Sequence, residues 1–220
     1  MLSIDIHKTY VNKSESVEVA CKGSFVRGEV TALFGKSGLG KTSVLRMIAG
    51  LEIPDKGTIR FDGEMWFDKD QITPLKERKV GMVFQDFNLF KNMSVLQNLA
   101  YASDGVLKPN IQKLCQDLGI DQLFQRYPHQ LSKGQQQKVA IIRSMCIQSD
   151  VLLLDEPFSA LDDDSILDLI EVINKLLKEL VPIVILVTHR RDVILNMATS
   201  VIILDTNEQG KPENLLERKL

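Results

Sequence analysis

A glycine-rich segment at residues 35–42, GKSGLGKT, constrains this chain more than any other feature. The residues before it, 29–34, form a short run rich in β-formers, and residues 43–49 are typical of a helix. Glycines between a strand and a helix let successive backbone N–H groups turn towards one anion, and the helix adds the positive end of its dipole. The spacing GxxxxGK[ST] therefore predicts a phosphate-binding loop and, with it, nucleotide binding.

Two side chains of this loop have specific chemistry. Lys41 can reach the β- and γ-phosphates, and the Thr42 hydroxyl is placed to hold Mg²⁺. The helix is expected to begin at about Gly40. A glycine-rich turn that binds nothing is the alternative, and the flanking strand and helix disfavour it. The residues expected to contact the nucleotide here are Gly35, Lys36, Ser37, Gly38, Leu39, Gly40, Lys41, Thr42 and Ser43.

Composition limits the class of protein. A length of 220 residues with 44% hydrophobic content predicts one domain, or one domain with an inserted lobe. The net charge of −2 gives no reason to expect a nucleic-acid partner. Cys21, Cys115 and Cys146 form no CxxC pair, so we expect small buried residues in a reduced compartment. Without a signal peptide or a bilayer-length apolar run, we expect a soluble, cytosolic protein that could dock on a membrane protein.

Hydrophobic patterns outside the loop alternate between strands and helices. The start predicts a small antiparallel sheet with Tyr10 on the loop between its first two strands, and a later strand delivers Gln85. Further helices are expected at about 162–180 and at 212–216. The predicted strands are residues 2–7, 17–21, 29–34, 58–63, 65–67, 80–84, 151–154, 183–187 and 201–205.

Strand signals disappear between residues 86 and 148, and three helices are predicted to begin at Ser94, Pro109 and Ser132. No linker-like composition flanks this block, so an inserted lobe is expected rather than a separate domain. The predicted fold class is α/β. Residues 1–85 and 149–220 are expected to form the core, which has a mainly parallel sheet and an antiparallel β part. The helical lobe is expected at about residues 86–148.

Two acidic residues, Asp155 and Glu156, follow the apolar run 151–154. The carboxyl ends of parallel strands form the ligand-binding edge of an open α/β sheet. An aspartate there can hold Mg²⁺, and a glutamate one residue on can polarise a water that attacks the γ-phosphate. A solvated acidic pair is the alternative, and only the nearby phosphate loop makes the catalytic interpretation strong.

Residues 131–137, LSKGQQQ, predict a second helix start of functional interest. Ser132 and Gln135 form a capping box beside Gly134, and such an end is a possible phosphate site. Because the segment lies in the inserted lobe, we expect it to serve the phosphate loop of another subunit. A capped helix without a ligand would explain the same residues.

Together these segments resemble the nucleotide-binding subunit of an ATP-binding-cassette (ABC) transporter, over essentially the whole chain and in the family's order. The resemblance matches residues 35–42 to the Walker A loop, Gln85 to the Q-loop, 131–135 to the LSGGQ signature, 151–156 to the Walker B strand, 159–162 to the D-loop and His189 to the switch histidine.

This resemblance implies a P-loop NTPase core, ATP and Mg²⁺ as cofactors, and particular residue roles. Glu156 would be the general base, His189 would contact the γ-phosphate, and Gln85 would sense Mg²⁺ and the water. Tyr10 would stack on adenine. The expected Mg²⁺ ligands are Thr42, Gln85 and Asp155, and the expected catalytic residues are Lys41, Gln85, Glu156 and His189. Across a head-to-tail, ATP-dependent homodimer the site would be completed by Ser132, Lys133, Gly134, Gln135 and Asp162.

Three departures from the family pattern stand out. Lys133 replaces the first signature glycine, although Gly134 is kept, and an added positive charge beside phosphate should not weaken binding. Arg190 stands where an acidic residue usually follows the switch histidine, and the sequence offers no account of it. No regulatory β-domain is expected after the cassette, unlike in many sugar and sulfate importers.

The favoured hypothesis is the ATPase subunit of an importer on the cytoplasmic face of the inner membrane, working with an integral membrane permease and a periplasmic or extracellular solute-binding protein. Residues 80–90 and 129–137 most resemble the polar amino-acid branch, while the region of Trp66 resembles oxyanion importers as much. The alternatives are the ATPase of a lipoprotein-release or cell-division complex, and a soluble assembly factor.

Overall fold

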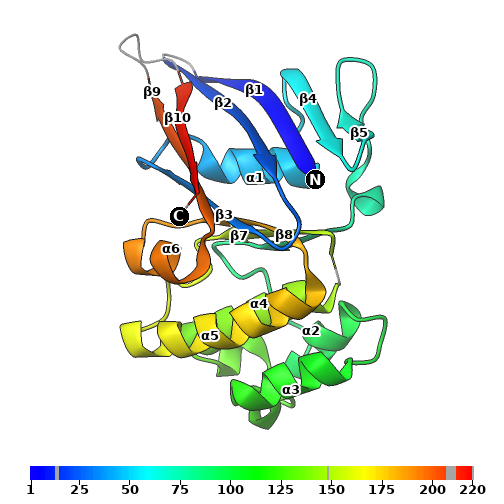
Figure 1. The fold of residues 1–220 in the computed structure, drawn as a ribbon. Coiled ribbons are helices and arrows are strands. Elements are labelled where there is room, and N and C mark those ends of the chain that lie inside the picture. The colour runs from blue at the N-terminus through cyan, green and yellow to red at the C-terminus, as the bar shows by residue number, and fades with distance from the viewer. Residues whose placement is uncertain (13–14, 148, 207–211, 220) are drawn as a thin grey trace.

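Two β-sheets enclose one helix, and further helices cover the far face of the larger sheet (Figure 1). The computed structural model describes residues 1–12, 15–147, 149–206 and 212–219. Helix α1, Lys41–Ala49, lies between the sheets and shares one hydrophobic core with both. A second core lies on the opposite face of the larger sheet, under helices α4 (Lys133–Cys146) and α5 (Asp163–Leu180).

The smaller sheet is antiparallel and has the strand order β2-β1-β4-β5. It contains β1 (Leu2–Asn12), β2 (Glu15–Phe25), β4 (Lys56–Phe61) and β5 (Glu64–Phe67), which confirms the predicted antiparallel start and hairpin. Tyr10 lies inside β1, opposite Val17, so its expected place on a loop was wrong. The ladder between β1 and β2 continues well beyond the alternating stretch that revealed the strands, because backbone pairing does not depend on side-chain alternation.

The larger sheet has the order β10-β9-β3-β8-β7-β6 and is parallel except at β10. The central strands β7 and β8 are buried along their whole length, as their continuous apolar sequences predict. Its strands are β3 (Val30–Gly35), β6 (Val80–Val83), β7 (Val151–Asp155), β8 (Ile183–Val187), β9 (Ser200–Thr206) and β10 (Pro212–Lys219).

The helix expected at residues 212–216 was wrong, because this segment lies in strand β10. It pairs antiparallel with β9, at the edge of the sheet. A segment of five residues is too short to sustain a helix alone, whereas pairing with β9 satisfies its backbone groups.

The remaining helices are α2 (Val95–Tyr101), α3 (Pro109–Asp117) and α6 (Arg191–Met197), with short 3₁₀ turns at Leu75–Glu77, Asp121–Leu123 and Pro128–Gln130. Ser94 and Ser132 begin α2 and α4 with the predicted capping boxes, and Pro109 opens α3. The three cysteines are buried, as expected. Within the described residues, no helix combines the length and apolarity that a bilayer crossing requires.

A buried arginine fixes the end of the helix that follows the glycine loop. The Arg78 side chain, 5% exposed, donates to the carbonyls of Met47 and Ile48 at 3.1 and 2.8 Å, at the C-terminal end of α1. It also donates to the carbonyls of Trp66 and Thr73, both at 2.9 Å. Burial lowers the pKa of Arg78 to about 10, which leaves it charged at neutral pH beside the negative end of the helix dipole.

Replacing Arg78 with methionine should lower the free energy of unfolding by about 2–4 kcal/mol, because buried carbonyls lose their donor. Urea unfolding of the purified chain measures this effect. Arg60→Met, at an exposed position of β4, is the matched control and should change stability by less than about 0.5 kcal/mol. Equal effects of the two substitutions would show that the Arg78 contacts do not stabilise this part of the fold.

Candidate active site

The glycine loop connects the end of β3 to the start of α1, as predicted. Gly40 is the N-cap of α1 with φ 79°, and Gly38 has φ 85°. A Cβ at residue 40 would lie 2.3 Å from a methyl group of Val19, so this position requires glycine for both conformation and space. The loop therefore places the free N–H groups at the start of α1 in the same cleft as Lys41, Asp155 and Glu156.

Lys41 folds back over this loop. Its ammonium donates to the carbonyls of Gly35 and Lys36 at 2.9 and 2.7 Å, and the residue is only 6% exposed. Burial lowers the pKa of Lys41, while the nearby carboxylates of Glu156 and Asp155 act in the opposite direction. The cation is thus held inside the loop, where a bound phosphate would meet it.

Asp155, at the carboxyl end of β7, lies next to the glycine loop. The Thr42 hydroxyl donates to Asp155 Oδ1 at 3.1 Å, and Asp155 is buried. Burial raises the pKa of Asp155, and the Thr42 hydrogen bond and the charge of Lys41 oppose that rise. A hydroxyl and a carboxylate in contact are hard oxygen donors that fit Mg²⁺.

Glu156 has an unusual backbone and an unpaired oxygen. Its φ of 48° lies in the left-handed region, which residues with side chains seldom adopt. Its buried Oε1 has no hydrogen-bond partner among the described residues, and His189 Nε2 lies 3.5 Å away. Burial raises the pKa of Glu156, and the proximity of His189 lowers it. An unpaired carboxylate oxygen of this kind can accept a hydrogen bond from a water in the cleft.

These side chains share one cleft of about 520 Å³. The structure therefore brings together the loop, the end of β7 and residues from two other strand ends. Gln85, which is exposed, and His189 also line the cleft, as do Ser159 and Val187, which were not among the expected site residues. Ser159 could have been found, since it opens the segment 159–162 that the family resemblance matches to the D-loop. The lining residues are Ser37, Gly38, Gly40, Lys41, Thr42, Gln85, Asp155, Glu156, Ser159, Val187 and His189.

The predicted signature residues lie elsewhere. Ser132 and Lys133 are exposed at the start of α4, and none of Ser132, Lys133, Gly134 and Gln135 lines the cleft. Asp162 likewise caps α5, accepting from the Ser165 N–H at 2.9 Å. Within one chain, these groups are therefore not joined to the phosphate loop.

Tyr10 also lies outside the cleft lining, on β1. Its hydroxyl donates to Glu52 Oε1 at 2.7 Å, just after α1. Burial raises the pKa of Tyr10, a contact with the Ser43 hydroxyl opposes the rise, and Glu52 adds to it. The Tyr10 hydroxyl is thus held between Glu52 and Ser43, the latter in the first turn of α1.

Arg190 has well-defined partners in the fold. Its guanidinium contacts Asp192 at 2.6 and 3.2 Å and Asp163 at 2.7 Å, so it joins the start of α6 to the start of α5. These two hydrogen-bonded carboxylates raise the pKa of Arg190 above its usual range. The positive residue after His189 therefore finds its partners at two helix N-termini, where aspartates are favoured.

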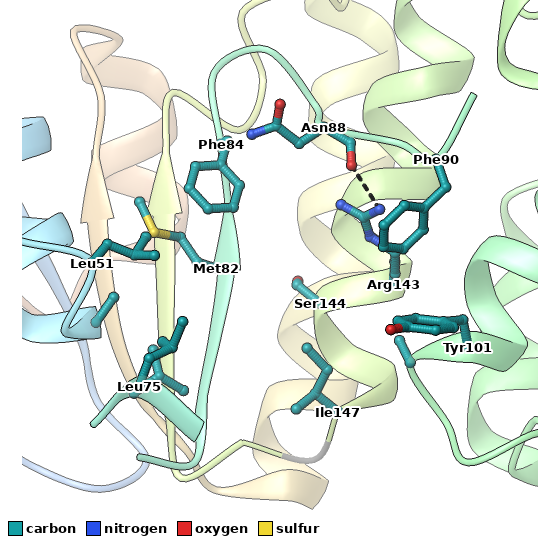
Figure 2. A pocket seen from close by; sticks show the side chains of 13 residues that line it. Leu51, Leu75, Met82, Phe84, Asn88, Phe90, Tyr101, Arg143, Ser144 and Ile147 are labelled. Atoms are coloured by element: carbon teal, nitrogen blue, oxygen red, sulfur yellow. Dashed lines mark hydrogen bonds between the residues drawn. The ribbon is translucent and has the colours of Figure 1, made fainter. Parts of the chain in front are cut away.

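A second concavity, also of about 520 Å³, lies between β6 and the helices that follow it (Figure 2). It is mostly apolar, and Tyr101 is 67% exposed and packs edge-on against Phe90. Arg143 donates to the carbonyls of Asn88 and Phe87, which fixes the segment that runs from Gln85 to the groove. We call this the apolar groove; its lining is Ala49, Leu51, Leu75, Val80, Met82, Phe84, Asn88, Phe90, Tyr101, Ala102, Arg143, Ser144 and Ile147.

A phosphate loop after β3 and an acidic pair at the end of β7 define the class of P-loop NTPases. Comparison with protein families specifies this further. The family model described as "ABC transporter" matches residues 20–159, and this chain belongs to that family.

Individual proteins similar to this chain are also ATP-binding proteins of transporters. The chain is 39% identical over 203 residues to the sulfate/thiosulfate import ATP-binding protein CysA of Ralstonia nicotianae, covering 86% of this chain and 54% of the relative. It is 37% identical over 215 residues to the molybdenum import ATP-binding protein ModC of Haemophilus ducreyi, covering 96% and 59%. The chain thus spans little more than half the length of these relatives. Their names do not support the expected likeness to the polar amino-acid branch.

A solved structure confirms the predicted fold. The dimeric structure of MJ0796, described as a bacterial ABC transporter cassette, matches with a TM-score of 0.82 and 27% identity, covering 100% of this chain and 99% of that one. A second structure of MJ0796 is described as a dimer in a post-hydrolysis state bound to ADP and Pi, and matches with a TM-score of 0.81.

Proposed function

We propose that this chain binds ATP with Mg²⁺ and hydrolyses it. The observation that supports this most is the single cleft that joins Lys41, the Thr42–Asp155 pair and Glu156. Lys41 and the N–H groups of α1 would bind the phosphates, and Thr42 and Asp155 would hold the metal. Bound Mg²⁺ would neutralise phosphate charge.

The unpaired oxygen of Glu156 fits a general base. It would accept a proton from the water that attacks the γ-phosphate, and burial keeps it poised for that task by raising its pKa. His189, 3.5 Å away, would contact the γ-phosphate, and Gln85 at the rim would sense the metal and the water. Tyr10, beside α1, would stack on adenine.

A second copy of this chain would complete the site. The start of α4 and Asp162 lie outside the cleft of their own chain, which supports a head-to-tail pair in which each serves the partner's phosphates. The structures of MJ0796 are described as dimeric, which supports pairing of two such chains. Lys133, at the exposed start of α4, would add a positive charge beside the phosphates.

We further propose that this ATPase energises an importer through a separate membrane permease, on the cytoplasmic face of the membrane. The names of the relatives favour import, and they favour an oxyanion over a polar amino acid as the solute. A solute-binding protein would belong to the same complex. Within the chain, residues 86–148 would act as the helical lobe beside a core formed by residues 1–85 and 149–220.

The proposed contact with the permease is the apolar groove. Phe84 and Asn88, which follow β6, line this groove (Figure 2). A partner seated there would therefore touch the segment that also carries Gln85, a residue of the cleft. Its exposed aromatic residues are of the kind that anchor protein interfaces.

The direct test of hydrolysis is phosphate release from ATP by the purified chain, measured at enzyme excess over ATP so that slow turnover is detected. We expect release with Mg²⁺ and none when EDTA removes it. A chain that binds no ATP at millimolar concentration, or releases phosphate equally well in EDTA, would contradict the proposal.

Tyr101→Glu tests the groove. A carboxylate in this apolar surface should weaken association with the permease by about tenfold or more. ATP hydrolysis by the isolated chain should stay within about twofold, because the residue is remote from the cleft. Co-purification from membranes measures the association. Leu167→Glu, an exposed apolar position on α5, is the control and should not affect it. Equal recovery of Tyr101→Glu and wild type would exclude the groove as the contact.

A further inference from the structure

A buried glutamine connects helix α4 to the turn that carries Glu156. Gln137 is 1% exposed, and its Oε1 accepts from the Ala160 N–H at 2.9 Å. Its Nε2 donates to the Glu156 carbonyl and to the Ser159 hydroxyl, both at 3.3 Å. One side chain thus binds three groups of a single five-residue turn, residues 156–160.

This turn needs external support. Glu156 has φ 48°, a conformation that persists in a residue with a side chain only where the surroundings hold it. On one side, its N–H donates to the Val187 carbonyl at 2.9 Å, at the end of β8. On the other side, its carbonyl accepts from Gln137. The backbone that aims the Glu156 carboxylate into the cleft is therefore held from β8 and from α4.

Helix α4 also contacts residues 160 and 161 through Gly134, which lies three residues before Gln137. A Cβ at Gly134 would lie 2.9 Å from a methyl group of Leu161 and 3.4 Å from the Ala160 carbonyl. Residues 134 and 137 share one face of α4, because residues three apart in a helix are neighbours. The start of α4 thus packs directly on the turn, and Gln137 makes the polar part of that contact.

We propose that Gln137 is a positioning residue for Glu156: it couples the position of helix α4 to the orientation of the catalytic carboxylate in the same chain. This inference rests on the proposed hydrolysis of ATP. When α4 shifts, Gln137 moves the Glu156 carbonyl and Ser159 with it. The helix whose start would serve the partner's phosphates therefore adjusts the base in its own cleft.

Gln137→Met tests this, because methionine has a similar length and makes none of the three hydrogen bonds. We expect kcat to fall roughly ten- to hundredfold, since a small displacement of a catalytic group costs this much. KM and ATP affinity should stay within about twofold, because the phosphate loop is untouched. Gln112→Met, on α3, is the matched control: its amide donates to the Leu107 carbonyl at 2.9 Å, and its kcat should remain within about twofold of wild type.

If Gln137→Met does not fold, a second variant, Gln137→Glu, tests the same inference. Gln137→Glu keeps an oxygen for the Ala160 N–H and places the other against the Glu156 carbonyl, so its kcat should also fall with unchanged ATP affinity. A kcat within about twofold of wild type in either folded variant would overturn the inference, as would equal losses in Gln112→Met and Gln137→Met. If wild type hydrolyses ATP in these assays, such a result would refute the role of Gln137 alone. A wild type that does not hydrolyse ATP would refute the proposed function first.

Discussion

Replacing Glu156 with glutamine is expected to abolish turnover while ATP binding remains. The substitution keeps the size of the side chain but removes the group that would take a proton from water. Loss of a general base lowers kcat by about 10²–10⁴-fold. ATP affinity should change little, because Lys41 and the loop N–H groups are unaffected. Steady-state phosphate release and binding of a fluorescent ATP analogue measure the two quantities separately.

The control for this variant is Glu171→Gln, which removes an exposed carboxylate on α5 and should leave both quantities unchanged. Hydrolysis by Glu156→Gln at the wild-type rate would refute the assignment of the base. The unpaired Oε1 would then need another explanation.

Lys41→Met should abolish ATP binding rather than the chemical step alone. Lys41 is held inside the loop by two carbonyls, so its charge is already in place before the phosphates arrive. Removing one partner from a buried charge pair costs about 3–5 kcal/mol, which corresponds to a loss of affinity of a hundredfold or more. Equilibrium binding of labelled ATP measures this loss.

Lys91→Met, at an exposed position, controls for the change in net charge and should bind ATP like wild type. Retained tight binding by Lys41→Met would show that the loop N–H groups suffice to hold the phosphates and that the Lys41 ammonium is not required.

The parts of the fold that sequence predicted correctly depend on local interactions. Ser94 and Ser132 each bind a backbone group three residues away, so their capping boxes can be recognised in a short window. The glycine loop is predictable for the same reason, since its function requires a strand, a turn and a helix in direct succession. The buried strand β7 was evident from its continuous apolar run.

The errors and omissions involve partners that are distant in sequence. Tyr10 and the segment 212–216 were misplaced because their conformations depend on pairing with β2 and β9. Arg78 binds carbonyls up to 31 residues away, and Arg190 binds an aspartate 27 residues away. No local pattern encodes such contacts, and Gln137 is a further case.

The most direct test of the proposed mechanism is the molar mass of purified Glu156→Gln with and without MgATP, measured by light scattering. The central claim is that a second chain completes the ATP cleft through the start of α4, despite Lys133. We predict a monomer without nucleotide and a dimer with MgATP, because hydrolysis no longer releases the pair. A protein that binds ATP and remains a monomer would contradict the claim.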